Sequence, residues 1–147
     1  MGLMLDTNVF IFSERSGSPI DFLQWNEYGD VYMSSVTVSE LLVGVHYANS
    51  EARKARRSAF VEYILGNVPV LAFDTEIARI HAGLFATLFE KGQMIGAHDL
   101  IIAATALFYN CAVLTDNTDE FGRVAGLDTI SYLNPAIAHL DCISPVF

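Results

Sequence analysis

Short apolar runs alternate with longer amphipathic segments along this chain. Apolar runs of this length are typical of strands that are buried on both faces of a sheet, and they lie at residues 3–5, 31–33, 68–73, 112–114 and 129–133. Between the runs, apolar residues recur three and four positions apart, which is the spacing of an amphipathic helix. This spacing covers residues 20–25, 38–45, 52–64, 77–88 and 100–108.

The alternation of strands and helices predicts an α/β fold. A strand–helix–strand unit normally makes a right-handed crossover, so successive units build a parallel sheet with helices on both faces. Sheets of this kind bind their ligands beyond the carboxyl ends of the strands. Polar residues that follow the predicted strands are therefore the candidates for a functional site.

Length and composition fit one domain over residues 1–147. Apolar residues make up 52% of the chain, and the mean hydropathy is +0.37, so the core is large or apolar surface is kept for a partner. No apolar stretch reaches the roughly 18 residues of a membrane span, and the first residues lack the basic start of a secretory signal. Two cysteines, Cys111 and Cys142, are expected as free thiols. These features predict a cytoplasmic protein.

The net charge of −9 counts against a protein that binds nucleic acid through a basic surface. A basic cluster gathers four of the eight Lys and Arg residues, at Arg53, Lys54, Arg56 and Arg57. It is interpreted as a solvated helix face, with contact to an RNA backbone as the alternative. An enzyme that holds its substrate through cations needs carboxylates, and an acidic chain also suits a basic protein partner.

Three acidic residues lie at the starts of predicted helices, and each has a structural alternative. Asp6 directly follows the first apolar run and has the position of a helix N-cap. Glu40 is expected in the first turn of the next helix and fits a capping box with Thr37. Asp99 would favour the dipole of a helix that continues with apolar residues 100–102. Because that helix is expected to be buried, its acid needs a partner or a metal.

A fourth acidic segment follows the apolar run at residues 112–114. It contains Asp116, Asn117, Asp119 and Glu120, and its alternative is a solvated turn. Together, these acids would meet at one edge of the sheet, where like charges repel and raise each other's pKa. A divalent cation neutralises such a cluster, and oxygen ligands without Cys or His spacing favour Mg²⁺ or Mn²⁺. Mg²⁺ held by carboxylates typically acts on phosphates.

The chain carries four short motifs in a specific order and spacing. They are Leu5-Asp6-Thr7-Asn8, Ser39-Glu40-Leu41-Leu42-Val43-Gly44, Gly92-Gln93-Met94-Ile95-Gly96-Ala97-His98-Asp99-Leu100 and Leu114-Thr115-Asp116-Asn117-Thr118-Asp119-Glu120-Phe121. This set resembles the PIN-domain family, and within it most of all the VapC-type toxins of bacterial toxin–antitoxin pairs. The resemblance covers residues 4–133.

The resemblance implies a three-layer α/β/α fold with a central parallel sheet. It implies an endoribonuclease that depends on Mg²⁺ or Mn²⁺ and often acts on structured RNA such as tRNA. It further implies inhibition by a cognate antitoxin and assembly into a homodimer. The expected protein is therefore the toxin of a type II toxin–antitoxin pair.

The resemblance also assigns site residues. The three nearly constant acids of the family, which hold the metal, correspond to Asp6, Glu40 and Asp99. Thr115 matches the hydroxyl residue after the fourth strand. Many relatives place an Asp two positions further on, where this chain has the uncharged Asn117. The fourth catalytic carboxylate is then sought among Asp116, Asp119 and Glu120. Of these, Asp119 is favoured.

The expected reaction is hydrolysis of a phosphodiester bond by water, which attacks in line and leaves 5′-phosphate and 3′-hydroxyl ends. A cation held by the acids would lower the pKa of a bound water and stabilise the developing charge. Two alternatives stay open. One is a Mg²⁺-dependent phosphatase of another α/β family, although Asn8 stands where the common Asp-x-Asp motif needs a second acid. The other is a non-catalytic binding module whose acids are helix caps.

Overall fold

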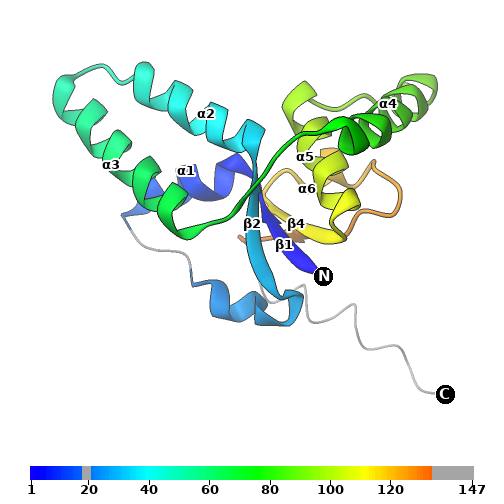
Figure 1. Cartoon of the computed structure of the whole chain (residues 1–147), viewed down its shortest axis with the longest axis horizontal. Coiled ribbons are helices and arrows are strands. Elements are labelled where there is room, and N and C mark those ends of the chain that lie inside the picture. Colours follow the sequence, from blue (N-terminus) through cyan, green and yellow to red (C-terminus); the bar gives the residue numbers. More distant parts are fainter. Residues whose placement is uncertain (18–20, 134–147) are drawn as a thin grey trace.

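The computed structural model describes residues 1–17 and 21–133, which form a five-stranded parallel sheet flanked by helices (Figure 1). The strands, in the order β3-β2-β1-β4-β5, are β1 (Gly2–Leu5), β2 (Asp30–Ser34), β3 (Val70–Leu71), β4 (Cys111–Thr115) and β5 (Thr129–Ser131). Each predicted apolar run contains or overlaps one of them, so the predicted α/β fold is confirmed. The run at residues 68–73 yields only a short strand, because β3 lies at the edge and pairs with β2 alone.

Helices connect the strands, and the spacing of apolar residues predicts all of them except the first and the last; the first was expected only from the N-cap position of Asp6. They are α1 (Thr7–Ser16), the 3₁₀ helix η1 (Phe22–Tyr28), α2 (Ser35–His46), α3 (Glu51–Asn67), α4 (Thr75–Glu90), α5 (Ala97–Phe108) and α6 (Thr118–Phe121). The segment predicted at residues 20–25 corresponds to η1, and residue 20 lies outside the described residues. The sequence does not predict α6, because so short a helix shows no periodic pattern.

The side chains of β1 alternate between two hydrophobic cores. Leu3 and Leu5 pack in the core beneath α1, α2 and α3, whereas Met4 packs in the core beneath α4, α5 and α6. In Figure 1 the first three helices lie to the left of the strands and the other three to the right. All of β1 is buried, which explains why its sequence is a continuous apolar run. The three-layer α/β/α architecture is confirmed.

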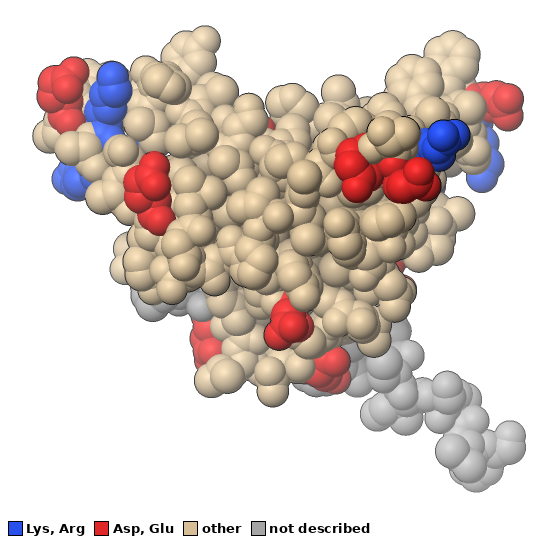
Figure 2. All heavy atoms as spheres, in the orientation of Figure 1, with Lys and Arg blue, Asp and Glu red and all other residues tan. Residues whose placement is uncertain are grey.

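The carboxyl ends of β1, β2 and β4 meet at one edge of the sheet, between the two groups of helices. In the parallel register, Leu5 lies opposite Met33 of β2 and Leu114 of β4. Asp6 therefore follows β1 directly beside Thr115, the last residue of β4. With all atoms drawn, the outline of the molecule is still indented between the arm formed by α2 and α3 and the arm formed by α4 (Figure 2).

The apolar stripe predicted over residues 52–64 of α3 is only partly buried. Ile64 belongs to the core together with Val61, which the predicted stripe does not include. Tyr63 is 69% exposed. The alanines of the stripe are exposed as well. The predicted helix is confirmed, but its apolar stripe reaches the core only in the second half of α3.

Two further expectations concern the membrane and the cysteines. Within residues 1–17 and 21–133, no helix is long and apolar enough to cross a membrane. Cys111 is a buried free thiol, and burial raises its pKa. Cys142 lies outside the described residues.

Candidate active site

Asp6 lies where the chain turns from the centre of the sheet into α1. Its side chain is the N-cap of α1 and accepts a hydrogen bond from the backbone N–H of Thr7 at 2.7 Å. Its second carboxylate oxygen accepts a hydrogen bond from the hydroxyl of Thr115, also at 2.7 Å. The predicted cap is therefore confirmed, but it occupies only one oxygen of a carboxylate that is 4% exposed. Burial raises the pKa of Asp6, and the nearby charge of Glu40 adds to this effect.

The hydroxyl of Thr115 links the ends of two neighbouring strands. Besides donating to Asp6, it accepts hydrogen bonds from the backbone N–H of Asn117 at 2.9 Å and from the side-chain amide of Asn8 at 3.3 Å. The side-chain amide of Asn117 in turn donates to Asp99 at 3.1 Å. A chain of hydrogen bonds thus runs from Asp6 to Asp99. It brings together two of the predicted acids and both of the predicted supporting residues.

Glu40 lies in the second turn of α2, and its side chain contacts α1 and α5. Its Oε1 accepts a hydrogen bond from the hydroxyl of Thr7 at 2.8 Å, and its Oε2 lies 3.4 Å from Nδ1 of His98. The predicted capping box of Thr37 with Glu40 is wrong, because the N-cap of α2 is Ser34. Glu40 therefore does not cap its own helix and is held by α1 instead.

Asp99 is the third residue of α5, and its surroundings disfavour its charge. Burial first, and then the charges of Asp6 and Glu120, raise the pKa of Asp99 from 3.8 to about 7. A helix N-terminus by itself would favour a carboxylate, so burial and repulsion outweigh that effect here. Glu120 accepts a hydrogen bond from the backbone N–H of Gly96 at 2.9 Å. This bond lowers the pKa of Glu120, so Glu120 ionises before Asp99 as the pH rises.

The acids of the fourth segment differ in what they contact. Residues three apart in a helix lie on one face, and α6 accordingly turns Asn117 and Glu120 toward Asp99. Asp119 is exposed, and across the described residues its side chain forms no hydrogen bond or ion pair. The sequence favours Asp119 as the fourth acid, whereas the contacts place Glu120 beside Asp99.

Three contacts of the site were not predicted from the sequence. They are the hydrogen bond from Thr7 to Glu40, the amide of Asn8 between Thr115 and Asp116, and the contact of Glu120 with the start of α5. Thr7 and Asn8 belong to the sequence motif around Asp6, and this motif was the one feature of the sequence that placed them near the site. The roles of their side chains depend on how α1 is turned relative to α2 and β4.

The donor set of the site fits a hard divalent cation. Within the described ranges, no three His, Cys, Asp or Glu side chains already stand together as a metal centre. Mg²⁺, however, is usually bound through one or two carboxylates and completes its shell with water and substrate phosphate. Asp6 and Asp99 form such a pair, and the charge of Asp6 opposes ionisation of Asp99. A cation between them would remove that repulsion, and Glu40 lies next to Asp6.

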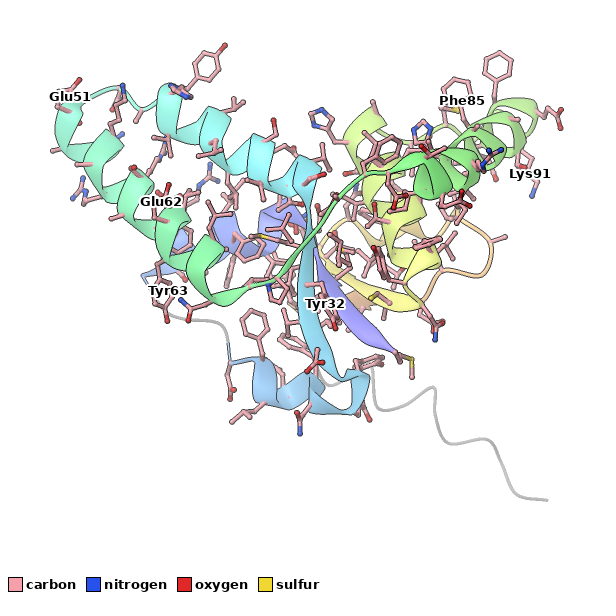
Figure 3. The ribbon with its side chains drawn as sticks, viewed as in Figure 1. Tyr32, Glu51, Glu62, Tyr63, Phe85 and Lys91 are labelled. Atoms are coloured by element: carbon pink, nitrogen blue, oxygen red, sulfur yellow. The ribbon has the colours of Figure 1, made fainter. Side chains whose placement is uncertain are left out.

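The basic cluster lies on α3, and one of its members, Arg57, lines a small cavity together with Glu40. The cluster occupies the first half of α3, whose outer end is marked by Glu51 in Figure 3. On the face shown in Figure 2, Lys and Arg lie near the outer ends of the two arms. Arg57 forms an ion pair with Glu14 at 3.1 Å and donates to the carbonyl of Gly44 at 3.0 Å. Arg57 therefore ties α3 to α1 and α2 and is not simply a solvated residue.

Comparison with known proteins identifies relatives that all belong to one family. The family model described as PIN domain matches residues 3–127. Ribonuclease VapC1 of Rickettsia felis is 35% identical over 131 residues, which is 89% of this chain and 96% of that protein. The tRNA(fMet)-specific endonuclease VapC of Shigella flexneri is 34% identical over 128 residues, with 86% and 94% covered. The crystal structure of DNA-bound VapBC from Salmonella typhimurium is similar with a TM-score of 0.79 and 29% identity, covering 90% of this chain and 98% of that one.

Proposed function

This chain belongs to the PIN-domain family as an endoribonuclease of the VapC toxin type, and we propose that it hydrolyses RNA with a divalent cation held by Asp6 and Asp99. The observation that carries the proposal is the hydrogen-bond chain that joins these two acids through Thr115 and Asn117. It holds two mutually repelling carboxyl groups at the edge of the sheet where ligands of parallel sheets bind. Helix capping explains Asp6 but not Asp99, because no side chain caps α5.

Each side chain of the site has a distinct task. Mg²⁺ or Mn²⁺, when bound, would supply a Lewis acid for the scissile phosphate and lower the pKa of a water molecule. Asp6 is fixed by two hydrogen bonds, one on each carboxylate oxygen, which leaves a lone pair on each oxygen for a cation. Glu40 has one oxygen engaged by Thr7 and keeps the other near His98, where it can accept a hydrogen bond from water. Glu120, which fixes the start of α5, is proposed as the fourth acid in place of Asp119.

The partners follow from the same family. The relatives of known structure include VapBC complexes, and we propose that this chain is likewise bound and inhibited by a cognate antitoxin in the cytoplasm. The net charge of −9 and the acids of the site favour a basic antitoxin segment. We also propose that the chain forms a homodimer and that its substrate is a structured RNA such as tRNA.

The proposed function is tested by the identity of the attacking group. Water attack does not use the 2′-hydroxyl of the RNA, so a substrate with a single 2′-deoxy sugar at the cut site should still be cut. The products should carry 5′-phosphate and 3′-hydroxyl ends, which mass spectrometry of the fragments identifies. A cyclic phosphate among the products, or a deoxy substrate that binds but is never cut, would contradict the proposal.

A second prediction concerns the positioning of Glu40. The Thr7→Val variant removes the hydroxyl that holds Glu40 and should lower kcat about tenfold, since a hydrogen bond to a charged group contributes about 1.5–3 kcal/mol. KM should change little, because Thr7 is buried and its hydroxyl is engaged by Glu40. Thr7→Ser keeps the hydroxyl and is the matched control. Wild-type kcat in Thr7→Val, with an unchanged melting temperature, would show that Glu40 needs no such support.

A further inference from the structure

A cavity of about 400 Å³ lies beside the acids, between α1 and the residues that follow β4 and β5. The residues that line it include Asn8 and Asp116 on the side of the site and Phe12, Arg15 and Tyr132 further out. Its volume falls within the range of small-molecule sites. The acids proposed to hold the cation do not line this cavity, so the cavity would bind a different part of a ligand from the part that the cation binds.

One wall of the cavity is aromatic. The rings of Phe12 and Tyr132 lie 5.3 Å apart between centroids and are tilted by 55° to each other. Phe12 is 44% exposed although it is fully apolar. Burial first, and then the nearby Asp116, raise the pKa of Tyr132 to about 12, so this phenol is neutral at physiological pH. An exposed ring beside a half-buried one, in a cavity of this size, is suited to stack against a planar base.

The charged groups of the cavity divide it into an inner and an outer part. Asp116 stands on the inner side, where its charge would repel a phosphate but accept hydrogen bonds from the amino group of a base. Arg15 is exposed in the last turn of α1. Its side chain forms no ion pair with any residue in the ranges 1–17 and 21–133, whereas the neighbouring Glu14 is paired with Arg57. A cation that has no ion pair within the described part of a chain of net charge −9 is available for a phosphate.

The cavity is continuous with the catalytic acids through Asn8. The side-chain amide of Asn8 bonds both Asp116 and Thr115, and Thr115 bonds Asp6. A ligand in the cavity is therefore linked to Asp6 through two side chains, Asn8 and Thr115. An RNA strand whose scissile phosphate lies at Asp6 would bring an adjoining nucleotide to this opening.

We propose that this cavity is a nucleotide subsite, which binds the unpaired base next to the scissile phosphate on Phe12 and Tyr132 and a backbone phosphate on Arg15. This inference rests on the proposed function and adds to it a requirement of the substrate. The RNA must be single-stranded at the cut, because only an unstacked base can enter the cavity. Structured RNA would then be cut in loops rather than in helices.

The test uses a short RNA that the wild-type protein cleaves, together with copies that lack one base at each position around the cut. In the wild type, loss of one particular base next to the cut should raise KM about tenfold, as expected for loss of a stacked base. Phe12→Leu keeps an apolar side chain and removes the ring, so it should raise KM for the intact RNA by a similar factor. With the base-less RNA, Phe12→Leu should show no further increase.

A second variant tests the phosphate contact. Arg15→Gln should weaken binding of the RNA in a fluorescence anisotropy titration and reduce the slope of log K against log salt by about 0.7, which is one phosphate contact on a single strand. Lys91→Gln removes the same charge at the far end of α4 (Figure 3) and should leave the slope unchanged. Tyr47→Leu, at a side chain that is 84% exposed, is the matched control for Phe12→Leu.

The outcomes distinguish failure of the nucleotide subsite from failure of the proposed nuclease function. If the wild type cleaves RNA but loss of the base has the same effect in Phe12→Leu, or both variants behave as the wild type, the subsite is refuted and the nuclease stands. If the variants keep their KM and only lose inhibition by the antitoxin, the cavity belongs to the protein partner and the subsite is likewise refuted. If the wild type cleaves no RNA, the proposed function fails and the subsite fails with it.

Discussion

The Asp99→Asn variant is expected to lose RNA cleavage almost completely while it keeps its fold. Removal of a charge that holds the cation should lower kcat by more than about a hundredfold, since even changes around the ligands of a metal cost about 10–100-fold. The fold is expected to survive because Asn resembles the protonated form of Asp99. It can accept the hydrogen bond from Asn117 and donate one to Glu120, as protonated Asp99 does. Cleavage rates at saturating Mg²⁺ and Mn²⁺ measure the loss.

Matched variants make this loss interpretable. Glu62→Gln removes one charge from the exposed face of α3 (Figure 3), where Glu62 contacts none of the site acids in the described residues, and should keep full activity. Glu120→Gln should impair cleavage strongly and Asp119→Asn only weakly, because Glu120 alone of the two contacts Asp99. The opposite order would restore the assignment that the sequence favours. Near wild-type cleavage by both Asp99→Asn and Asp6→Asn would end the hypothesis of a metal-dependent hydrolase.

The fold and the three main acids could be predicted because they depend on local patterns and on the topology of parallel sheets. Apolar runs mark strands that are buried on both faces, and β1 is such a strand. Once the strands are parallel, residues at their carboxyl ends must meet at one edge. Asp6 and Thr115 therefore become neighbours without any knowledge of side-chain geometry. Asp99 needed the family resemblance as well, because it precedes a strand instead of following one.

The finer contacts could not be predicted because they depend on where each helix begins. The capping box of Thr37 with Glu40 required α2 to begin three residues later than its true N-cap, Ser34. Successive residues of a helix point in directions about 100° apart. Asp119 and Glu120 are successive residues, so only one of them can point toward Asp99. In α6, a helix of four residues, the sequence has no repeat that would fix this rotation.

The metal-free protein should become less stable as the pH rises from about 4 to about 7. The pKa of Asp99 is 3.8 in its ordinary state and about 7 in the folded protein. Between these values the unfolded chain has lost its proton while the folded protein keeps it, so unfolding releases a proton and is favoured by rising pH. The stability from this group is complete below pH 3.8 and is lost by about pH 7. The raised pKa of Asp6 acts in the same direction.

Substitution of the two acids should then have unequal effects on the melting temperature. Asp99→Asn removes the pH-dependent loss, so without metal it should melt above the wild type at pH 8 and close to it at pH 4. Asp6→Asn should melt lower, because its amide replaces an acceptor oxygen that takes the hydrogen bond of Thr115. That hydroxyl already accepts hydrogen bonds from Asn117 and Asn8 and cannot easily reverse its bond.

Addition of metal should reverse the order of the wild type and Asp99→Asn at pH 8. A cation that binds only the folded state adds RT ln(1 + [L]/Kd), or about 2.7 kcal/mol at a hundredfold excess over Kd. The wild type should gain this stabilisation from Mg²⁺ or Mn²⁺, and Asp99→Asn should gain much less. Glu62→Gln, which keeps the site, should respond as the wild type does.

If the acids were only helix caps, Asp→Asn would be nearly neutral because Asn caps about as well as Asp. Thermal melts that show no response to millimolar cation, with wild type and Asp99→Asn melting together at both pH values, would establish that the cluster is structural.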